Sequence, residues 1–256
     1  MHNKLTDELA VCGLKTVLAV GEYHPETINR LFLREDRLKM FTDICKQLAQ
    51  RKRPYKICDD EELERVSKTV HHQGVVAMIE EPVIAPLSQE DLDFWASEGK
   101  TGILLHSVGN DHNLGAIARA AAFFDAHFLI LNEKDVLTTS AYRVAEGGME
   151  HIAVRKISDT AAFLKDASRK IITAGTDTRA RLRITDMETI FKEKRAKLKI
   201  KGRGGVVLVF GNEETGLPEN VKNQCSCMFR IPGTGNIESL NVSQAASLFL
   251  HALYEL

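Results

Sequence analysis

The sequence has no long apolar run and no apolar segment near its first residue. Nowhere among its 256 residues do the roughly 18 apolar residues of a membrane-spanning helix stand together. Met1 is followed by polar and charged residues, where a signal peptide would have an apolar core. We therefore expect a cytoplasmic protein that has no membrane as a partner.

Cysteine is also scarce. The five cysteines are odd in number and scattered, which fits a reducing cytosol better than a disulfide framework. Cys225 and Cys227 are close in sequence, but no second pair of Cys or His follows at the spacing of a zinc site. We expect this pair to belong to a strand, and we expect no metal.

Net charge is nearly absent, with 34 Lys and Arg against 35 Asp and Glu. This balance neither favours nor excludes a nucleic acid as a partner. Hydrophobic residues at 44% and charged residues at 27% are typical of a globular protein, which excludes a disordered or fibrous chain. The length is natural for two domains of unequal size.

Prolines mark the boundary between two regions. Pro82 and Pro86 flank a short apolar piece, and each disfavours helix at the residue before it, so we expect a linker there. Upstream, the apolar pattern indicates helices near 14–18 and 38–50 and a buried strand over 74–79. The predicted division is a small α/β domain at 1–82, a linker at 83–99 and a second domain at 100–256.

In the second region, apolar strands alternate with helical patterns. The predicted strands are 102–109, 128–131, 171–175, 205–211 and 229–232, and the clearest helices are 113–124 and 240–256. Strands that are apolar throughout and alternate with helices indicate a parallel sheet with helices on both faces. The predicted fold class is therefore α/β, and such sheets bind ligands in the loops at the carboxyl ends of their strands.

Two stretches are rich in basic residues. Residues 191–203 hold seven basic residues and one acid, and 51–53 form a smaller cluster. Most runs of this kind are solvated surface. Alternatively, they contact phosphates, because cations that meet a polyanion release its counterions. Both interpretations stay open on the pattern alone.

Three polar segments follow predicted strands of the second region. Residues 111–119 open a helix, and Asn113 is placed to cap it. Residues 210–218 form a loop whose glycines allow a ligand to approach the backbone, without the Lys-Ser/Thr pair of a phosphate-binding loop. Residues 231–243 are rich in glycine and lead into the last helix. Capping alone explains the first and the third segment, but three such segments at one end of a sheet indicate a site.

These segments, in this order, resemble the motifs of the SpoU/TrmH family in the SPOUT superfamily of RNA ribose 2′-O-methyltransferases. The matching stretches are N-L-G-A-I-A-R, V-L-V-F-G-N-E-E-T-G-L and R-I-P-G-T-G-N-I-E-S-L-N-V-S-Q-A-A. The upstream region, with H-Q-G-V-V-A from His72, is similar to the L30e-like substrate-binding domain of that family. The resemblance implies a trefoil knot in the C-terminal segment, S-adenosylmethionine as methyl donor, a homodimer, and structured rRNA or tRNA, not DNA, as partner.

The resemblance also implies roles for individual residues. The catalytic residues would be Asn113, Arg119, Glu213, Ser239 and Asn241. The cofactor contacts would be Gly175, Thr176, Gly211, Ile231, Pro232 and Leu240, and the RNA contacts Arg51, Lys52, Arg53, Lys197, Lys199 and Lys201. A guanidinium stays protonated and is a poor base. We therefore expect Arg119 to anchor phosphate and to stabilise the developing oxyanion.

The chain departs from the family pattern at a few positions. Ala120, Gly233 and Gln244 replace residues that are common in relatives, and the connection from 176 to 204 is longer. These differences leave the chemistry intact and leave the substrate open between rRNA, which is favoured, and tRNA. A catalytically inactive RNA-binding protein of the same fold is the alternative, although binding alone would not need all five polar residues. Another nucleotide-using enzyme is disfavoured, because G-x-G-x-x-G and a Walker lysine are absent.

Overall fold

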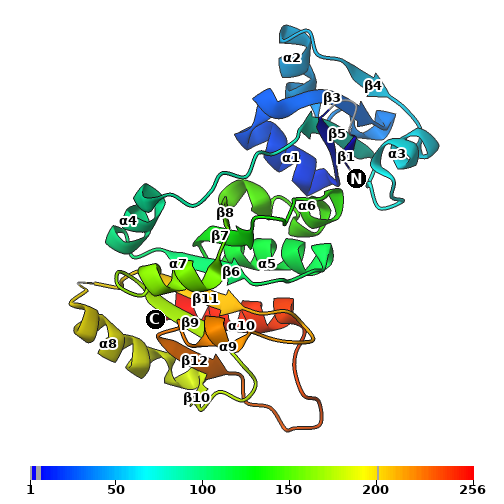
Figure 1. The fold of residues 1–256 in the computed structure, drawn as a ribbon. Coiled ribbons are helices and arrows are strands. Elements are labelled where there is room, and N and C mark those ends of the chain that lie inside the picture. The colour runs from blue at the N-terminus through cyan, green and yellow to red at the C-terminus, as the bar shows by residue number, and fades with distance from the viewer. Residues whose placement is uncertain (1, 4–6, 201) are drawn as a thin grey trace. The chain divides into compact units, whose positions relative to one another are not determined.

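The computed structural model of the protein describes residues 2–3, 7–200 and 202–256. The chain forms two compact units, which are described separately (Figure 1). The first unit consists of residues 1–83, 114–119 and 136–151, and the second of 84–113, 120–135 and 152–256. Within the described residues, no helix is both long and apolar enough to cross a membrane.

The first unit is built on a mixed sheet with the strand order β1-β2-β5-β3-β4. All neighbours are antiparallel except β3 and β4. The strands are β1 (His2–Asn3), β2 (Glu8–Cys12), β3 (Ile28–Leu33), β4 (Tyr55–Ile57) and β5 (Val75–Glu80). The helices are α1 (Leu14–Tyr23), α2 (Thr42–Gln50), α3 (Asp60–Ser67) and α6 (Thr139–Ala145), with short 3-10 turns at Pro25–Thr27, Glu35–Arg37 and Gly148–His151.

The second unit contains the predicted parallel sheet. Over the described ranges, its order is β10-β12-β9-β11-β6-β7-β8, and every pair of neighbours is parallel. The strands are β6 (Thr101–Leu105), β7 (Ala126–Asn132), β8 (Ala153–Ile157), β9 (Ile172–Thr176), β10 (Leu182–Arg183), β11 (Val206–Phe210) and β12 (Cys227–Arg230). The helices are α4 (Gln89–Ser97), α5 (Asp111–Phe123), α7 (Thr160–Ala167), α8 (Met187–Leu198), α9 (Glu219–Lys222) and α10 (Val242–Tyr254), with a 3-10 turn at Ile184–Asp186. The middle of α5, residues 114–119, belongs to the first unit.

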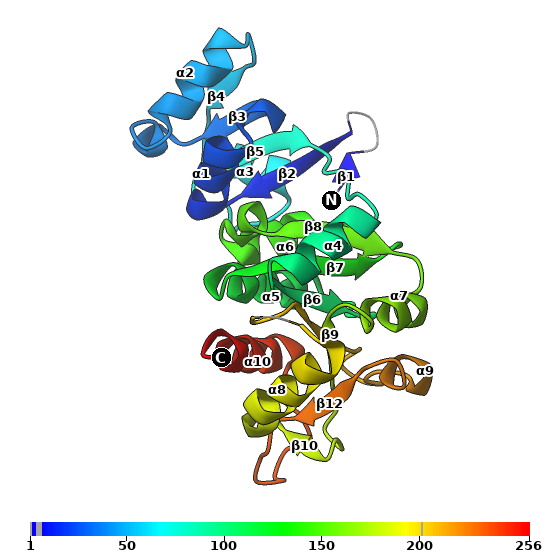
Figure 2. The same ribbon diagram turned by 90° about the vertical axis from the view of Figure 1, so that its left-hand side faces the viewer.

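Helices cover both faces of this sheet, as the sequence predicts. Val207 and Val209 of β11 pack in one buried cluster with residues of α4, α7 and α9, and α7 lies against α9 (Figure 2). Successive side chains of a strand point to opposite faces. Accordingly, Phe210 packs on the other side, where its ring lies 5.9 Å from that of Phe249 in α10. A strand buried on both faces has no polar alternation, which explains its uniformly apolar sequence.

A helix, α4, forms inside the range 83–99, for which the sequence predicts a linker. Ser88 and Asp91 form a capping box that starts the helix, and Leu92 and Trp95 are buried against the sheet. The short amphipathic pattern of α4 directly follows two prolines, and these favour the prediction of a linker over that of a helix. The segment 136–151 also differs from expectation, since it packs in the first unit although the sequence predicts one continuous domain from residue 100.

Trp95 is a central residue of the buried cluster that also contains Val207 and Val209 of β11. It is fully buried, its ring stacks on Phe128 with a centroid distance of 4.7 Å, and its Nε1 donates a hydrogen bond to the carbonyl of Lys100 at 2.8 Å. A Cβ on Gly102 would lie 2.1 Å from the indole ring, so the glycine makes room for it.

We expect Trp95→Ala to lower the free energy of unfolding by about 3–5 kcal/mol, the usual cost of truncating a buried large aromatic. Urea unfolding followed by circular dichroism measures the loss. Phe94→Ala is the matched control, because Phe94 is 42% exposed and should cost much less. Similar losses in the two variants would contradict the packing role of Trp95.

Candidate functional site

The three polar segments lie at one edge of the parallel sheet. The strands β12, β9, β11 and β6 are consecutive neighbours in the sheet and run in the same direction. The loops that follow their carboxyl ends therefore lie at the same edge. These loops carry most of the residues that the sequence predicts for the site.

Hydrogen bonds of Asn113 connect these segments. Asn113 is only 7% exposed, its Nδ2 donates to Oε1 of Glu213 at 2.7 Å, and its Oδ1 accepts from Nδ2 of Asn241 at 3.0 Å. The three side chains come from the start of α5, the loop after β11 and the start of α10. A buried amide that both donates and accepts is held in one orientation by its two partners.

Asn113 does not cap its helix, so the capping interpretation is wrong for this residue. The N-cap of α5 is Asn110, whose side chain accepts from the N–H of His112 at 2.8 Å. Asn241 by contrast is the N-cap of α10, because its Oδ1 accepts from the N–H of Ser243 at 2.8 Å. Asn241 therefore has two tasks: its oxygen starts a helix, and its nitrogen holds Asn113.

Asn212, which the sequence analysis did not single out, shapes the loop that carries Glu213. Its Nδ2 donates to the carbonyl of Ser107 at 2.9 Å, and its Oδ1 accepts from the N–H groups of Glu214 and Thr215 at 3.0 and 3.1 Å. An Asn that turns the chain by bonding residues just after it is a recognisable local signal. Gly211 is needed at the base of this loop, since a Cβ there would lie 2.3 Å from the carbonyl carbon of Gly216.

The other two predicted catalytic residues are Arg119 and Ser239. Arg119 lies on α5, six residues after Asn113. Its Nη1 pairs with Oε1 of Glu146 at 3.1 Å. Ser239 is exposed and forms no hydrogen bond with the residues that the structure describes.

The residues predicted to hold a cofactor border the same edge. Gly175 and Thr176 end β9, and Oγ1 of Thr176 donates to the carbonyl of Val209 at 3.1 Å. Ile231 and Pro232 follow β12, Gly211 follows β11, and Leu240 is 48% exposed. In 233–240, only the N–H of Asn236 donates to a described residue, at 3.4 Å. Free neutral backbone donors beside exposed apolar side chains suit a ligand that carries both hydroxyls and an apolar ring.

The predicted RNA contacts differ in whether their side chains are exposed or already bonded to other residues. Arg53 is engaged inside the first unit, where its Nη1 donates to the carbonyls of Glu26 and Ile28 at 2.8 and 2.7 Å. Arg51 and Lys52 are exposed, as are Lys197 on α8 and Lys199 at its end. Lys201 lies outside the described residues.

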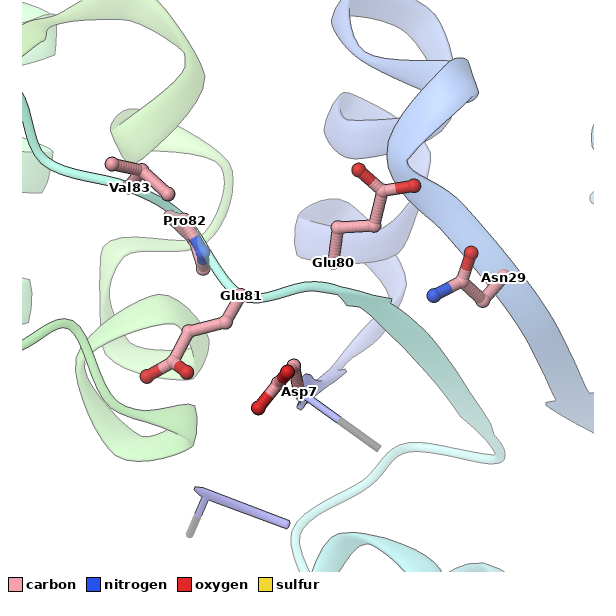
Figure 3. A pocket seen from close by; sticks show the side chains of 6 residues that line it. All are labelled: Asp7, Asn29, Glu80, Glu81, Pro82 and Val83. Atoms are coloured by element: carbon pink, nitrogen blue, oxygen red, sulfur yellow. The ribbon is translucent and has the colours of Figure 1, made fainter. Parts of the chain in front are cut away.

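The first unit also has a cavity of about 460 Å³, which is a poor candidate for the site (Figure 3). Asp7, Glu80 and Glu81 bring three carboxylates to it, and Asn29, Pro82 and Val83 complete its lining. This charge repels a phosphate, and none of the predicted site residues lies there.

The cysteines and carboxylates of the described residues do not meet the needs of a metal ion. Cys227 begins β12 and Cys225 precedes it; burial raises the pKa of Cys225 to about 12 and that of Cys227 to about 11. Both therefore stay protonated thiols, which are poor ligands. Across the described ranges, no three His, Cys, Asp or Glu side chains are grouped so that they could hold a metal ion.

Comparison with known proteins adds independent findings. Residues 100–251 match the model of the SpoU rRNA methylase family, and residues 10–84 match the model described as RNA 2′-O ribose methyltransferase substrate binding. A 23S rRNA (guanosine-2′-O-)-methyltransferase of Acinetobacter baylyi is 30% identical over 252 residues, covering 95% of this chain and 94% of the relative. An uncharacterized tRNA/rRNA methyltransferase of Escherichia coli is 26% identical over 98% of this chain and 69% of its own length.

A solved structure has the same fold. The rRNA methyltransferase of Sinorhizobium meliloti with bound AdoMet superposes with a TM-score of 0.78 at 22% identity, and the match covers 98% of this chain and 88% of that one.

The two tasks of Asn241 can be separated by substitution. Ser caps a helix almost as well as Asn, whereas Ala does not, and neither supplies the nitrogen that holds Asn113. We expect Asn241→Ala to lower the free energy of unfolding by about 1 kcal/mol more than Asn241→Ser, measured by urea unfolding. Asn236→Ala, in the exposed loop, is the control and should change little. Equal losses for Ala and Ser would contradict a stabilising cap.

Proposed function

The chain belongs to the SpoU rRNA methylase family, and we propose that it transfers a methyl group from S-adenosylmethionine to a ribose 2′-hydroxyl of structured RNA. The observation that carries this proposal is the hydrogen-bonded trio of Asn113, Glu213 and Asn241, one residue from each of the three motif segments. A trio that joins all three motifs at the ligand-binding edge of a parallel sheet supports a common active site.

The residues at this edge fit S-adenosylmethionine. The cofactor supplies a methyl group on a sulfonium, which is already reactive toward an oxygen nucleophile. Backbone groups after β9, β11 and β12, with Leu240, are the proposed contacts, and the open loop 233–240 offers neutral donors. The sulfonium of S-adenosylmethionine is positively charged, so a cationic side chain beside it would repel it. Neutral backbone donors avoid this repulsion.

The task of the protein is then to align and activate a weakly acidic hydroxyl. Asn113, fixed by Glu213 and Asn241, is placed to hold the ribose by hydrogen bonds, and Ser239 completes the polar surroundings. Arg119 holds an RNA phosphate and stabilises the oxyanion that develops on the ribose. Because a guanidinium stays protonated, we assign the departing proton to phosphate or solvent.

The favoured substrate is rRNA. The Acinetobacter relative, named for 23S rRNA, matches this chain over nearly its full length, whereas the name of the Escherichia relative leaves tRNA and rRNA open. The substrate-binding region at 10–84 suits RNA with unpaired bases, because proteins read sequence in loops and bulges rather than in A-form duplex.

The wider organisation is part of the same proposal. We keep 1–82 as the substrate-binding domain, 83–99 as the connection that includes α4, and 100–256 as the catalytic domain with a C-terminal knot. The proposal includes a homodimer, which is supported by the exposed Phe123 and Tyr254 at the ends of α5 and α10. It also includes a cytoplasmic location.

A catalytically inactive RNA-binding protein of the same fold is the alternative. Calorimetric titration with S-adenosylmethionine separates the two, because only the enzyme needs the cofactor. Binding supports the proposal, and absence of binding favours the alternative.

Arg119→Ala should reduce methyl transfer at least about a hundredfold, the scale of losing one oxyanion donor, with fold and cofactor affinity unchanged. Single-turnover transfer of tritiated methyl groups to rRNA and tRNA from cells that lack the gene measures this. Arg169→Ala is the matched control, since Arg169 is exposed and forms a surface ion pair with Asp166. Near-normal rates in Arg119→Ala would remove this residue from the reaction.

Lys197→Gln combined with Lys199→Gln should weaken RNA binding broadly. The slope of log affinity against log salt should fall by roughly 0.7–0.9 for each lost phosphate contact, measured by filter binding. Replacing the exposed Lys46 and Lys165 by Gln is the matched control. An unchanged slope would indicate that the basic residues of α8 are solvated surface and do not contact the RNA.

A further inference from the structure

The turn that ends α6 is packed tightly between α1 and residues 114–119 of α5, all within the first unit. A Cβ on Gly148 would lie 2.9 Å from the Cα of Arg119 in α5. A Cβ on Gly147 would lie 2.9 Å from the Cβ of Ala19 in α1. A side chain at either position would meet these atoms, so only glycine fits the turn that follows Glu146.

Glu146 is itself in an unusual conformation. It is the C-cap of α6 with φ 47° and ψ 44°, in the left-handed region where glycine is the common residue. A residue with a Cβ is disfavoured there, and such conformations persist where the surroundings impose them, often at functional sites. Lys68 and Lys199 end α3 and α8 in the same conformation, so the role of Glu146 has to be argued from its contacts.

The carboxylate of Glu146 links the two flanking helices. Its Oε1 lies 3.1 Å from Nη1 of Arg119, and its Oε2 accepts a hydrogen bond from Nζ of Lys15 at 2.9 Å. The Lys15 ammonium, with a smaller contribution from Arg119, holds the pKa of Glu146 below its usual range, so the group is ionised at neutral pH. Ion pairs this exposed add little to stability, so stability alone does not account for the arrangement.

We propose that Glu146 is a positioning residue that orients Arg119 for the RNA substrate, and that Lys15 holds Glu146 in turn. This inference rests on the proposed function. A guanidinium has five N–H donors. Glu146 engages Nη1, which restricts the rotation of the side chain and leaves the other donors for a phosphate. Lys15 lies within residues 10–84, so the substrate-binding region helps to orient Arg119.

Glu146→Gly provides the sharpest test, because it removes the carboxylate and suits the left-handed backbone. We expect kcat to fall about tenfold, since misoriented groups lose much of their effect, with KM and cofactor affinity within about threefold of wild type and no loss of thermal stability. Glu146→Gln keeps an acceptor and should restore part of kcat. Lys15→Met should reduce kcat less than Glu146→Gly.

A double variant tests whether Glu146 affects methyl transfer through Arg119. If Glu146 acts through Arg119, adding Glu146→Gly to Arg119→Ala lowers methyl transfer no further. A second tenfold loss in the double variant would overturn the proposal, as would normal kcat in Glu146→Gly. Raised activity and RNA affinity in Glu146→Gly would also overturn it, because Glu146 would then compete with the RNA for Arg119.

The contact can also be measured without activity. In ¹⁵N NMR spectra, the Arg119 Nε–H of the wild type should be ordered and should become mobile in Glu146→Gly. If the wild type transfers no methyl group to rRNA or tRNA, the proposed function fails, and this spectrum still decides whether Glu146 holds Arg119. Unchanged mobility would overturn the positioning role by itself.

Discussion

The side-chain amide of Asn113 accepts one hydrogen bond and donates another, and both partners lie at least 100 residues further along the chain. A buried amide must find such partners or pay the cost of losing water. The loop after β11 and the start of α10 are therefore tied to the start of α5 by the same bonds that shape the polar surface. Because Asn241 also begins a helix with its oxygen, the fold and the site depend on one side chain.

This arrangement is set before any ligand arrives. Asn212 shapes the loop that presents Glu213. Glu146, which precedes the closely packed Gly147 and Gly148, pairs with Arg119. Polar groups fixed in this way need little rearrangement when charge develops on a substrate, which is the main source of electrostatic catalysis. The α5 helix carries both Asn113 and Arg119, yet each is held by its own set of neighbours.

The sequence predicts the central strands well, because β9 and β11 are buried on both faces and hence apolar throughout. It does not reveal β8, whose half-buried A-V-R-K-I resembles surface, nor α4, which follows a proline-marked stretch. The sequence does not show which asparagine caps α5, because Asn110 and Asn113 are equally suited to that role. No local pattern could link Arg119 to Glu146, since 27 residues separate them and only tertiary packing brings them together.

Methylation of ribose in cellular RNA is the activity proposed for the edge that these three motifs form. It is tested most directly by mapping 2′-O-methyl nucleotides, through nuclease digestion and mass spectrometry, in rRNA and tRNA from cells with and without the gene. We expect at least one ribose methyl group to disappear, from rRNA in the favoured case, and to return with the wild-type protein but not with Arg119→Ala. An unchanged set of ribose methyl groups in both RNA pools would contradict it.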